Sequence, residues 1–173
     1  MGRDKATLDL GGTTLAERSA TIIRTALPEA AVSPVDATDD IYRERGPLGG
    51  LHSALTAAKA DWIFLLACDL PFVTPELIHR LNMRISVDSD AVIPAQADGG
   101  LQPLCGFYRV EPCLAAAATL LESDPKAALR DLFKQVPPTV ASFAQLADLA
   151  GSEHFFLNLN TPDDLELARR LVA

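Results

Sequence analysis

An aspartate, Asp69, comes just after the apolar run at residues 62–67 (WIFLLA). The run is too short for a helix and is typical of a strand that is buried on both faces of a parallel sheet. Ligands bind beyond the carboxyl ends of such strands, and Mg²⁺ is usually held by one or two carboxylates together with substrate phosphates. The pattern therefore predicts that Asp69 binds a metal, with a turn or helix cap as the structural alternative.

Two glycine-bearing segments are suited to contact phosphate groups. Lys5 follows a short glycine-containing stretch, where a lysine can place a point charge on phosphate oxygens. Residues 46–50 (GPLGG) open a predicted helix over 48–60. Gly46 and Gly50 permit close approach of the backbone, and the free N–H groups at a helix start attract an anion. A solvated lysine and a tight turn are the structural alternatives for these two segments.

Two asparagines stand near the end of the chain, in residues 158–162 (NLNTP). In an extended segment, alternation places Asn158 and Asn160 on the same side, where their amides can bind phosphate, sugar or a metal-bound water. Asn160 and Thr161 are also good candidates to cap the last helix. That alternative explains Asn160 but does not explain Asn158.

The elements that must position these residues alternate between short apolar runs and amphipathic segments. This alternation predicts one α/β domain over residues 1–173, a Rossmann-like three-layer sandwich with a mostly parallel sheet and helices on both faces. A central strand normally opens such a domain and none precedes Lys5, so the first strand and its glycine-rich loop are expected to be incomplete. The predicted helices cover residues 14–27, 48–60, 75–83, 112–122, 126–134 and the stretch from 162 onward, and the predicted strands cover 62–67, 90–94, 102–108, 139–143 and 154–157.

Composition excludes several classes of function. A chain of 173 residues, 49% hydrophobic and 22% charged, fits an ordinary soluble globular protein. The formal net charge of −8 argues against non-specific nucleic-acid binding. We see no secretory signal and no apolar run near the roughly 20 residues of a membrane span. We therefore expect a cytoplasmic protein with neither nucleic acid nor membrane as a partner.

The cysteines and histidines do not form a recognisable reactive set. Cys68, Cys105 and Cys113 match neither a zinc-ligand spacing nor a dithiol motif, and we expect them to be small hydrophobic residues in a reducing compartment. The histidines are scattered, and His52 is expected to pack on a helix surface. Nothing resembles an Asp-Ser-His or Cys-His nucleophilic set, so covalent catalysis is not expected.

Read together, these segments resemble the molybdenum cofactor guanylyltransferases, the MobA-type members of the nucleotide-diphospho-sugar transferase-like superfamily. No single motif is diagnostic, but all occur in the order and spacing of the family over nearly the whole chain. The resemblance implies a Rossmann-like fold and transfer of GMP from GTP to molybdopterin-bound molybdenum, with release of pyrophosphate. The matching segments are residues 1–6 (MGRDKA) with Leu8 and Gly11, 46–50 (GPLGG), 68–71 (CDLP), 102–104 (QPL) and 158–162 (NLNTP).

The resemblance also implies roles for particular residues. Lys5 would contact the GTP phosphates and Asp69 would coordinate Mg²⁺, so that both are catalytic. Asp40 would match the acidic residue that precedes the glycine segment and contact the nucleotide, although Asp36 and Asp39 fit the same register. The nucleotide-binding set implied in this way is Lys5, Asp40, Gly46, Gly50 and Asp69.

On the acceptor side, Asn158 and Asn160 would lie near the metal and the pterin. Relatives that transfer cytidylyl groups tend to carry acidic residues at these two positions, so the asparagines favour guanylyl transfer. The implied partners are GTP and molybdopterin, with molybdoenzymes or cofactor-carrier proteins as further partners. The alternatives are another nucleotidyltransferase of the superfamily, for cytidylyl or sugar-phosphate transfer, and a non-catalytic molybdopterin carrier.

Overall fold

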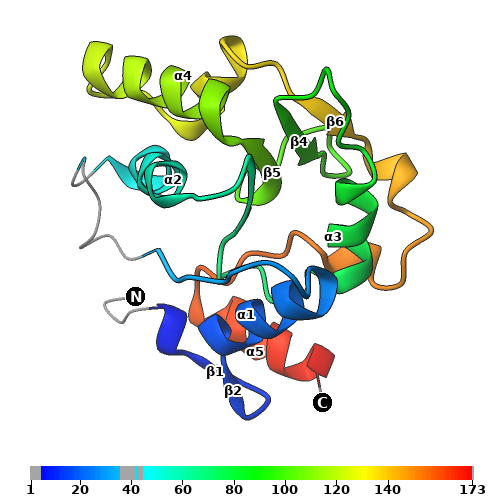
Figure 1. Cartoon of the computed structure of the whole chain (residues 1–173). Coiled ribbons are helices and arrows are strands. Elements are labelled where there is room, and N and C mark those ends of the chain that lie inside the picture. The colour runs from blue at the N-terminus through cyan, green and yellow to red at the C-terminus, as the bar shows by residue number, and fades with distance from the viewer. Residues whose placement is uncertain (1–4, 36–41, 43–44, 173) are drawn as a thin grey trace. The chain divides into compact units, whose positions relative to one another are not determined.

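The chain is described here by a computed structural model (Figure 1), which covers residues 5–35, 42 and 45–172. It divides into two compact units. Among the described residues, no helix has the length and apolar character needed to cross a bilayer. A single domain over residues 1–173 remains a prediction. The first unit contains Met1–Val32, Leu66–Arg80 and Ala144–Ala173, and the second contains Ser33–Leu65 and Leu81–Phe143.

A four-stranded sheet lies mostly in the second unit. Its strand order is β3 (Trp62–Leu66), β5 (Cys105–Arg109), β4 (Ala91–Pro94), β6 (Thr139–Ala141). β4 pairs in parallel with β6 and antiparallel with β5. This partly parallel sheet with its helices confirms the predicted α/β class, and the strands fall at the predicted places, although β5 begins later than the range 102–108.

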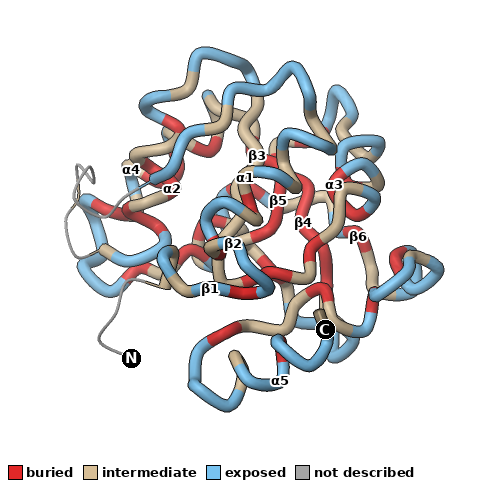
Figure 2. The backbone as a smooth tube through the Cα atoms, turned by 90° about the horizontal axis from the view of Figure 1, so that it is seen from below, coloured by how far each residue is buried: buried red, intermediate tan, exposed pale blue. Residues whose placement is uncertain are grey.

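The strand that leads to Asp69 is an edge strand of the described sheet. All five residues of β3 are half-buried, whereas the four residues of β4 are buried (Figure 2). An edge strand has a sheet neighbour on one side only, which leaves part of its backbone and surface uncovered. The prediction of a strand over 62–67 is confirmed, but the prediction that it is buried on both faces is wrong.

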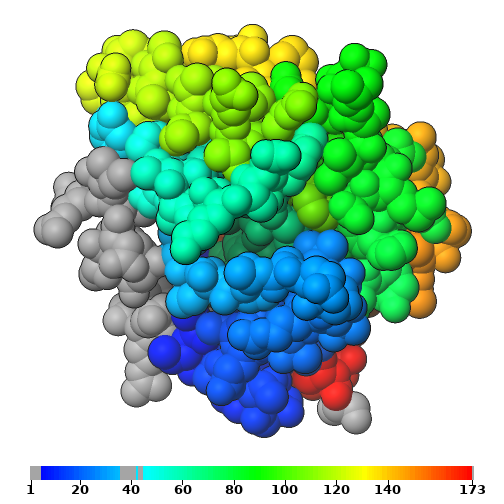
Figure 3. Space-filling model, in the orientation of Figure 1, coloured from blue at the N-terminus to red at the C-terminus, as the bar shows by residue number. Residues whose placement is uncertain are grey.

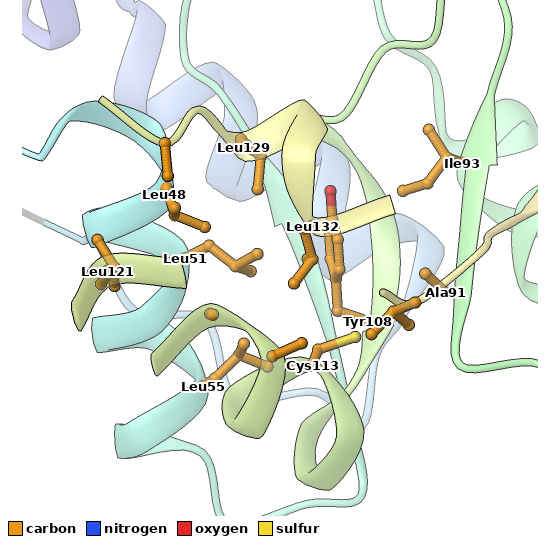
Figure 4. Close-up of a cluster of buried hydrophobic side chains, with 14 residues drawn as sticks. Leu48, Leu51, Leu55, Ala91, Ile93, Tyr108, Cys113, Leu121, Leu129 and Leu132 are labelled. Atoms are coloured by element: carbon orange, nitrogen blue, oxygen red, sulfur yellow. The ribbon is translucent and has the colours of Figure 1, made fainter. Parts of the chain in front are cut away.

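The core of the second unit is built from two helices and the sheet. α2 (Gly46–Ala57) and α4 (Val110–Ser123) pack directly on each other, and Figure 3 shows their surfaces in contact, cyan against yellow-green. Residues 114–121 of α4 (LAAAATLL) combine strong helix formers with small side chains. Figure 4 shows Leu51 and Leu55 of α2 among the side chains that fill this cluster. Burial of each such leucine contributes about 1.5–3 kcal/mol.

The cysteines largely follow expectation. Cys105 and Cys113 are buried, Cys68 is half-buried, and all three are free thiols. Burial raises the pKa of Cys113 to about 12 and raises that of Cys105 as well. A thiol with a raised pKa carries little of the reactive thiolate, so the two buried cysteines serve as packing residues.

In the first unit, a short 3₁₀ helix (Lys5–Thr7) is followed by a hairpin that the sequence did not predict. β1 (Asp9–Leu10) and β2 (Thr13–Thr14) pair antiparallel. The two glycines between them have φ of +69° and +87°, the left-handed values that a two-residue hairpin turn requires. α1 (Leu15–Ala26) follows with a capping box, because Thr14 accepts from Glu17 N at 3.2 Å and Glu17 accepts from Thr14 N at 2.9 Å. The predicted helix over 14–27 is confirmed.

Two further predicted helices are confirmed by their caps. α3 (Pro75–Asn82) starts where Thr74 Oγ1 accepts a hydrogen bond from Leu77 N at 3.3 Å. α5 (Pro162–Val172) starts at a proline, with aspartates in its first turn that complement the positive helix end.

Two segments have a secondary structure that differs from the predicted one. Residues 154–157 were predicted as a strand, but Ser152–His154 form a 3₁₀ helix and Leu157 N bonds back to His154 O at 3.0 Å. These backbone groups are satisfied locally, so they are not available to a sheet neighbour. Within residues 126–134, a 3₁₀ helix over Leu129–Lys134 replaces the predicted longer helix.

Candidate active site

Three predicted site residues meet in the first unit. Lys5 Nζ lies 3.2 Å from Asp69 Oδ2 and donates to Asn160 Oδ1 at 2.6 Å. These contacts join residues that are 64 and 155 positions apart in the sequence. A cation, a carboxylate and an amide therefore share one small, partly exposed site.

The backbone explains why Asp69 and Asn160 come together. Asp69 lies in the turn after β3, and its carbonyl accepts a hydrogen bond from Leu159 N at 3.0 Å. Leu159 is fully buried with Leu10 and residues of α1 and α5. The buried leucine anchors the segment, and Asn160, the next residue, is exposed beside Asp69.

Arg18 of α1 provides a second anchor for the turn that carries Asp69. Its Nε donates to Pro71 O at 2.9 Å. Arg18 and Pro71 also line a cavity of about 360 Å³ together with His154 and Leu171. This contact could not be predicted from the sequence, because a helix arginine has no local signature that reveals a distant carbonyl partner.

The two carboxylate oxygens of Asp69 have different surroundings. Oδ2 pairs with Lys5, whereas Oδ1 is buried and has no hydrogen-bond partner among the described residues. An unpaired buried carboxylate oxygen is costly for folding, and it is a hard oxygen donor of the kind that Mg²⁺ prefers. Asp69 therefore fits the predicted role of metal ligand.

The described residues contain no group of three or more His, Cys, Asp or Glu side chains that could hold a metal by themselves. An ion at Asp69 would therefore depend on oxygens from a bound substrate. This agrees with the usual habit of Mg²⁺, which binds one or two carboxylates together with phosphates.

Asn158 lies two residues before Asn160 and is half-buried. Its predicted place at the pterin end remains a prediction. Asp40 and its competitors for the same register, Asp36 and Asp39, lie outside the described residues.

The glycine segment belongs to the second unit, where α2 begins at Gly46 rather than at the predicted residue 48. Gly46 has φ of +56°, a backbone conformation that favours glycine. Gly50 lies within the first turns of α2. Arg45 ties this helix start to the end of α4, because its guanidinium donates to Leu121 O at 2.8 Å and to Asp124 O at 2.5 Å.

Two of the motif segments meet in a cavity of the second unit. Pro47 and Leu48 line a space of about 380 Å³ together with residues 102–104 (QPL) and Arg130. Gln102 is almost fully buried there. The cavity combines apolar walls with an amide that can donate and accept hydrogen bonds.

His52 is buried on α2, so the prediction of helix-surface packing is wrong. Its ring meets Tyr42 edge-on, with ring centroids 5.0 Å apart, and its Nδ1 has no hydrogen-bond partner in the described part of the chain. Burial lowers the pKa of His52, and nearby Glu122 opposes that shift. His52 therefore favours its neutral form in the folded protein.

This burial predicts a pH-dependent stability. The unfolded chain has a histidine pKa of about 6.5, so below that pH it binds protons that folded His52 resists. Stability is then retained above about pH 6.5 and falls as the pH drops below it. We expect urea unfolding to show a smaller loss of stability between pH 7.5 and 5.5 for His52→Gln than for wild type. His79→Gln, at an exposed site, should keep the wild-type slope, and an equal slope for both variants would contradict the assignment.

A lysine, a carboxylate and an amide thus lie together in a protein of the α/β class. The family model for the MobA-like NTP transferase domain matches residues 1–140. The chain therefore belongs to the MobA-like NTP transferase family.

Named relatives agree with this membership. A protein of Pelotomaculum thermopropionicum, named probable molybdenum cofactor guanylyltransferase, is 32% identical over 179 residues, covering 98% of this chain and 85% of its own. A Geobacillus protein with the same name is 31% identical over 128 residues, covering 74% of this chain. That match spans only 63% of the Geobacillus protein.

Solved structures share the fold. Molybdopterin-guanine dinucleotide biosynthesis protein A from Archaeoglobus fulgidus superposes with a TM-score of 0.79 at 22% identity, covering 99% of this chain and 91% of that one. The 2-C-methyl-D-erythritol 4-phosphate cytidylyltransferase of Thermus thermophilus gives a TM-score of 0.65 at 20% identity, covering 97% and 93%. This chain therefore shares its fold with both proteins.

Proposed function

We propose that this protein transfers GMP from GTP to molybdopterin-bound molybdenum, in the cytoplasm, and releases pyrophosphate. The observation that carries the proposal is the meeting of Lys5, Asp69 and Asn160 in one site. Relatives more than 30% identical that are named for this activity support it. The asparagines at positions 158 and 160 favour the guanylyl over the cytidylyl reaction.

The chemistry requires two anions to meet. The terminal phosphate of molybdopterin attacks the α-phosphate of GTP, the bond to the β-phosphate breaks, and pyrophosphate leaves. Such a reaction is accelerated mainly by charge neutralisation and by positioning. The residues of the site therefore act by holding charge in place rather than by forming a covalent intermediate.

Each residue has a definite task in this proposal. Lys5 offsets the negative charge that develops on the departing pyrophosphate, and Asn160 holds the lysine in place. Asp69 provides the carboxylate for Mg²⁺, which neutralises phosphate charge when bound. Asn158 contacts the pterin end.

The proposal also gives roles to the glycine segment and to Asp40. Gly46 and Gly50, at the start of α2, allow its free N–H groups to approach the phosphates of GTP. Asp40 contacts the nucleotide from the segment before α2.

A nucleotide panel tests the proposal. A ligand that binds only the folded state stabilises it by about 2.7 kcal/mol at a concentration of 100 Kd. With Mg²⁺ present, we expect GTP to raise the Tm more than CTP, ATP or UTP, and pyrophosphate release to require both GTP and molybdopterin. A larger shift with CTP would favour cytidylyl transfer, and pterin binding without GTP-dependent turnover would favour a carrier; either result would overturn the proposal.

A further inference from the structure

Asp164, in the first turn of α5, makes an unusual set of backbone contacts. Its Oδ2 accepts hydrogen bonds from Thr161 N at 2.7 Å and from Asn160 N at 2.9 Å. In return, Asp164 N donates to Thr161 Oγ1 at 3.2 Å. The reciprocal pair with Thr161 is a capping box, which satisfies free N–H groups at a helix start.

The bond to Asn160 N goes beyond what the helix cap requires. A capping box needs only the N–H of the cap residue, here Thr161. Asp164 also holds the N–H of the preceding residue, and that residue accepts from Lys5 at 2.6 Å through its side chain. One carboxylate oxygen therefore links the helix start to the lysine of the site.

Residues 159 and 160, which precede α5 and lie next to Asp69, are thereby fixed by two backbone hydrogen bonds. Leu159 N bonds to Asp69 O at 3.0 Å, and the next N–H along the chain, that of Asn160, bonds to Asp164. Asn160 is itself exposed, so packing does not hold it in place. The hydrogen bonds at positions 159 and 160 determine where its amide oxygen lies.

The charges agree with this arrangement. The pKa of Asp164 is lowered, chiefly by its hydrogen bonds with Thr161 and then by the bond from Asn160, with a smaller contribution from the positive charge of Lys5. Asp164 is therefore ionised at neutral pH, and its carboxylate oxygens act as hydrogen-bond acceptors.

We propose that Asp164 is a positioning residue, which fixes Asn160 so that its amide oxygen holds Lys5 beside Asp69. The consequence for GMP transfer rests on the proposed function. The effect on the position of Lys5 does not depend on the proposed function, because it concerns the protein without substrate.

The structure offers a matched pair of variants. Thr161→Ala removes the hydroxyl that accepts from Asp164 N and leaves both bonds to Asp164 Oδ2, whereas Asp164→Ala removes both bonds to Oδ2 and keeps the backbone N–H that donates to Thr161 Oγ1. Loss of a helix cap costs about 1 kcal/mol in general, so both variants weaken the helix start. Only Asp164→Ala frees Asn160 N. Asp164→Asn keeps an acceptor oxygen and should restore most of the wild-type behaviour.

The direct measurement is the rate at which an acylating reagent modifies Lys5, followed by mass spectrometry and normalised to the exposed Lys59. We expect Lys5 to react several times faster in Asp164→Ala than in wild type, Thr161→Ala or Asp164→Asn. Asn160→Ala should react at least as fast. Asp164→Ala combined with Asn160→Ala should react no faster than Asn160→Ala alone, since Asp164 acts through Asn160.

The kinetic measurement separates positioning from a general loss of stability. Loss of one hydrogen bond of this kind corresponds to about a 3–10-fold change, and we expect it as a rise in KM for GTP with a smaller change in kcat. Equal labelling of Lys5 in Asp164→Ala and Thr161→Ala would overturn the positioning role. A wild-type chain without GMP transfer would overturn the proposed function, while the labelling contrast would still decide the role of Asp164.

Discussion

Asp69→Asn is expected to lower kcat/KM for GMP transfer by at least about 10²–10³-fold, the cost of removing one essential charge-stabilising group. Asparagine has the same shape as aspartate and can still accept from Lys5. It lacks the negative charge that a divalent cation requires. The substitution therefore isolates charge from packing, and the assay is pyrophosphate release at saturating Mg²⁺.

Stability gives an independent check on this variant. Asp69 Oδ1 is buried and has no partner among the described residues, so its charge is costly for the folded state. We expect the Tm of Asp69→Asn to be equal to or higher than that of wild type. Asp163→Asn, at an exposed position in the first turn of α5, should leave the activity unchanged and lower the Tm only slightly, because it removes one charge that complements the helix start. Wild-type turnover in Asp69→Asn would exclude a metal role for this carboxylate.

The second large effect is expected for Lys5→Met, which should weaken GTP binding about 10–100-fold. Hydrogen bonds to charged groups contribute about 1.5–3 kcal/mol, and Lys5 is placed to make them with the triphosphate. Methionine preserves much of the length and apolar character of the lysine stem. Isothermal titration with GTP in the presence of Mg²⁺ measures the change directly.

Lys59→Met is the matched control, because Lys59 is an exposed lysine of the other unit. It should leave the affinity for GTP unchanged. An unchanged affinity in Lys5→Met would instead remove Lys5 from the nucleotide site. The contacts with Asp69 and Asn160 would then be a local structural link.

The local elements of this protein follow from its sequence. The helix at Leu15–Ala26 begins with a capping box, which the three-residue spacing of Thr14 and Glu17 indicates. The helix at Pro162–Val172 follows a threonine and begins with a proline. The strand at Trp62–Leu66 is visible as a short apolar run. These signals are local because helix caps and side-chain periodicity involve residues within a few positions of each other.

The sequence predicts Lys5, Asp69 and Asn160 as site residues from their neighbours along the chain. The residue types at Asp69 and Asn160 indicate binding, and the segments around them match those of the family. The signal for Asp164 was also present, because Thr161 and Asp164 have the spacing of a capping box. What the sequence did not reveal is that the same carboxylate reaches Asn160.

Tertiary structure decided how these parts meet. The direction of pairing between β4 and β5, the edge position of β3 and the burial of His52 depend on neighbours that are distant in sequence. The same holds for Lys5, whose partners lie 64 and 155 positions away. Residue types and spacing specify which groups can bind a phosphate or a cation. Only the folded chain brings those groups within hydrogen-bond distance, because that step depends on long-range packing and backbone hydrogen bonds.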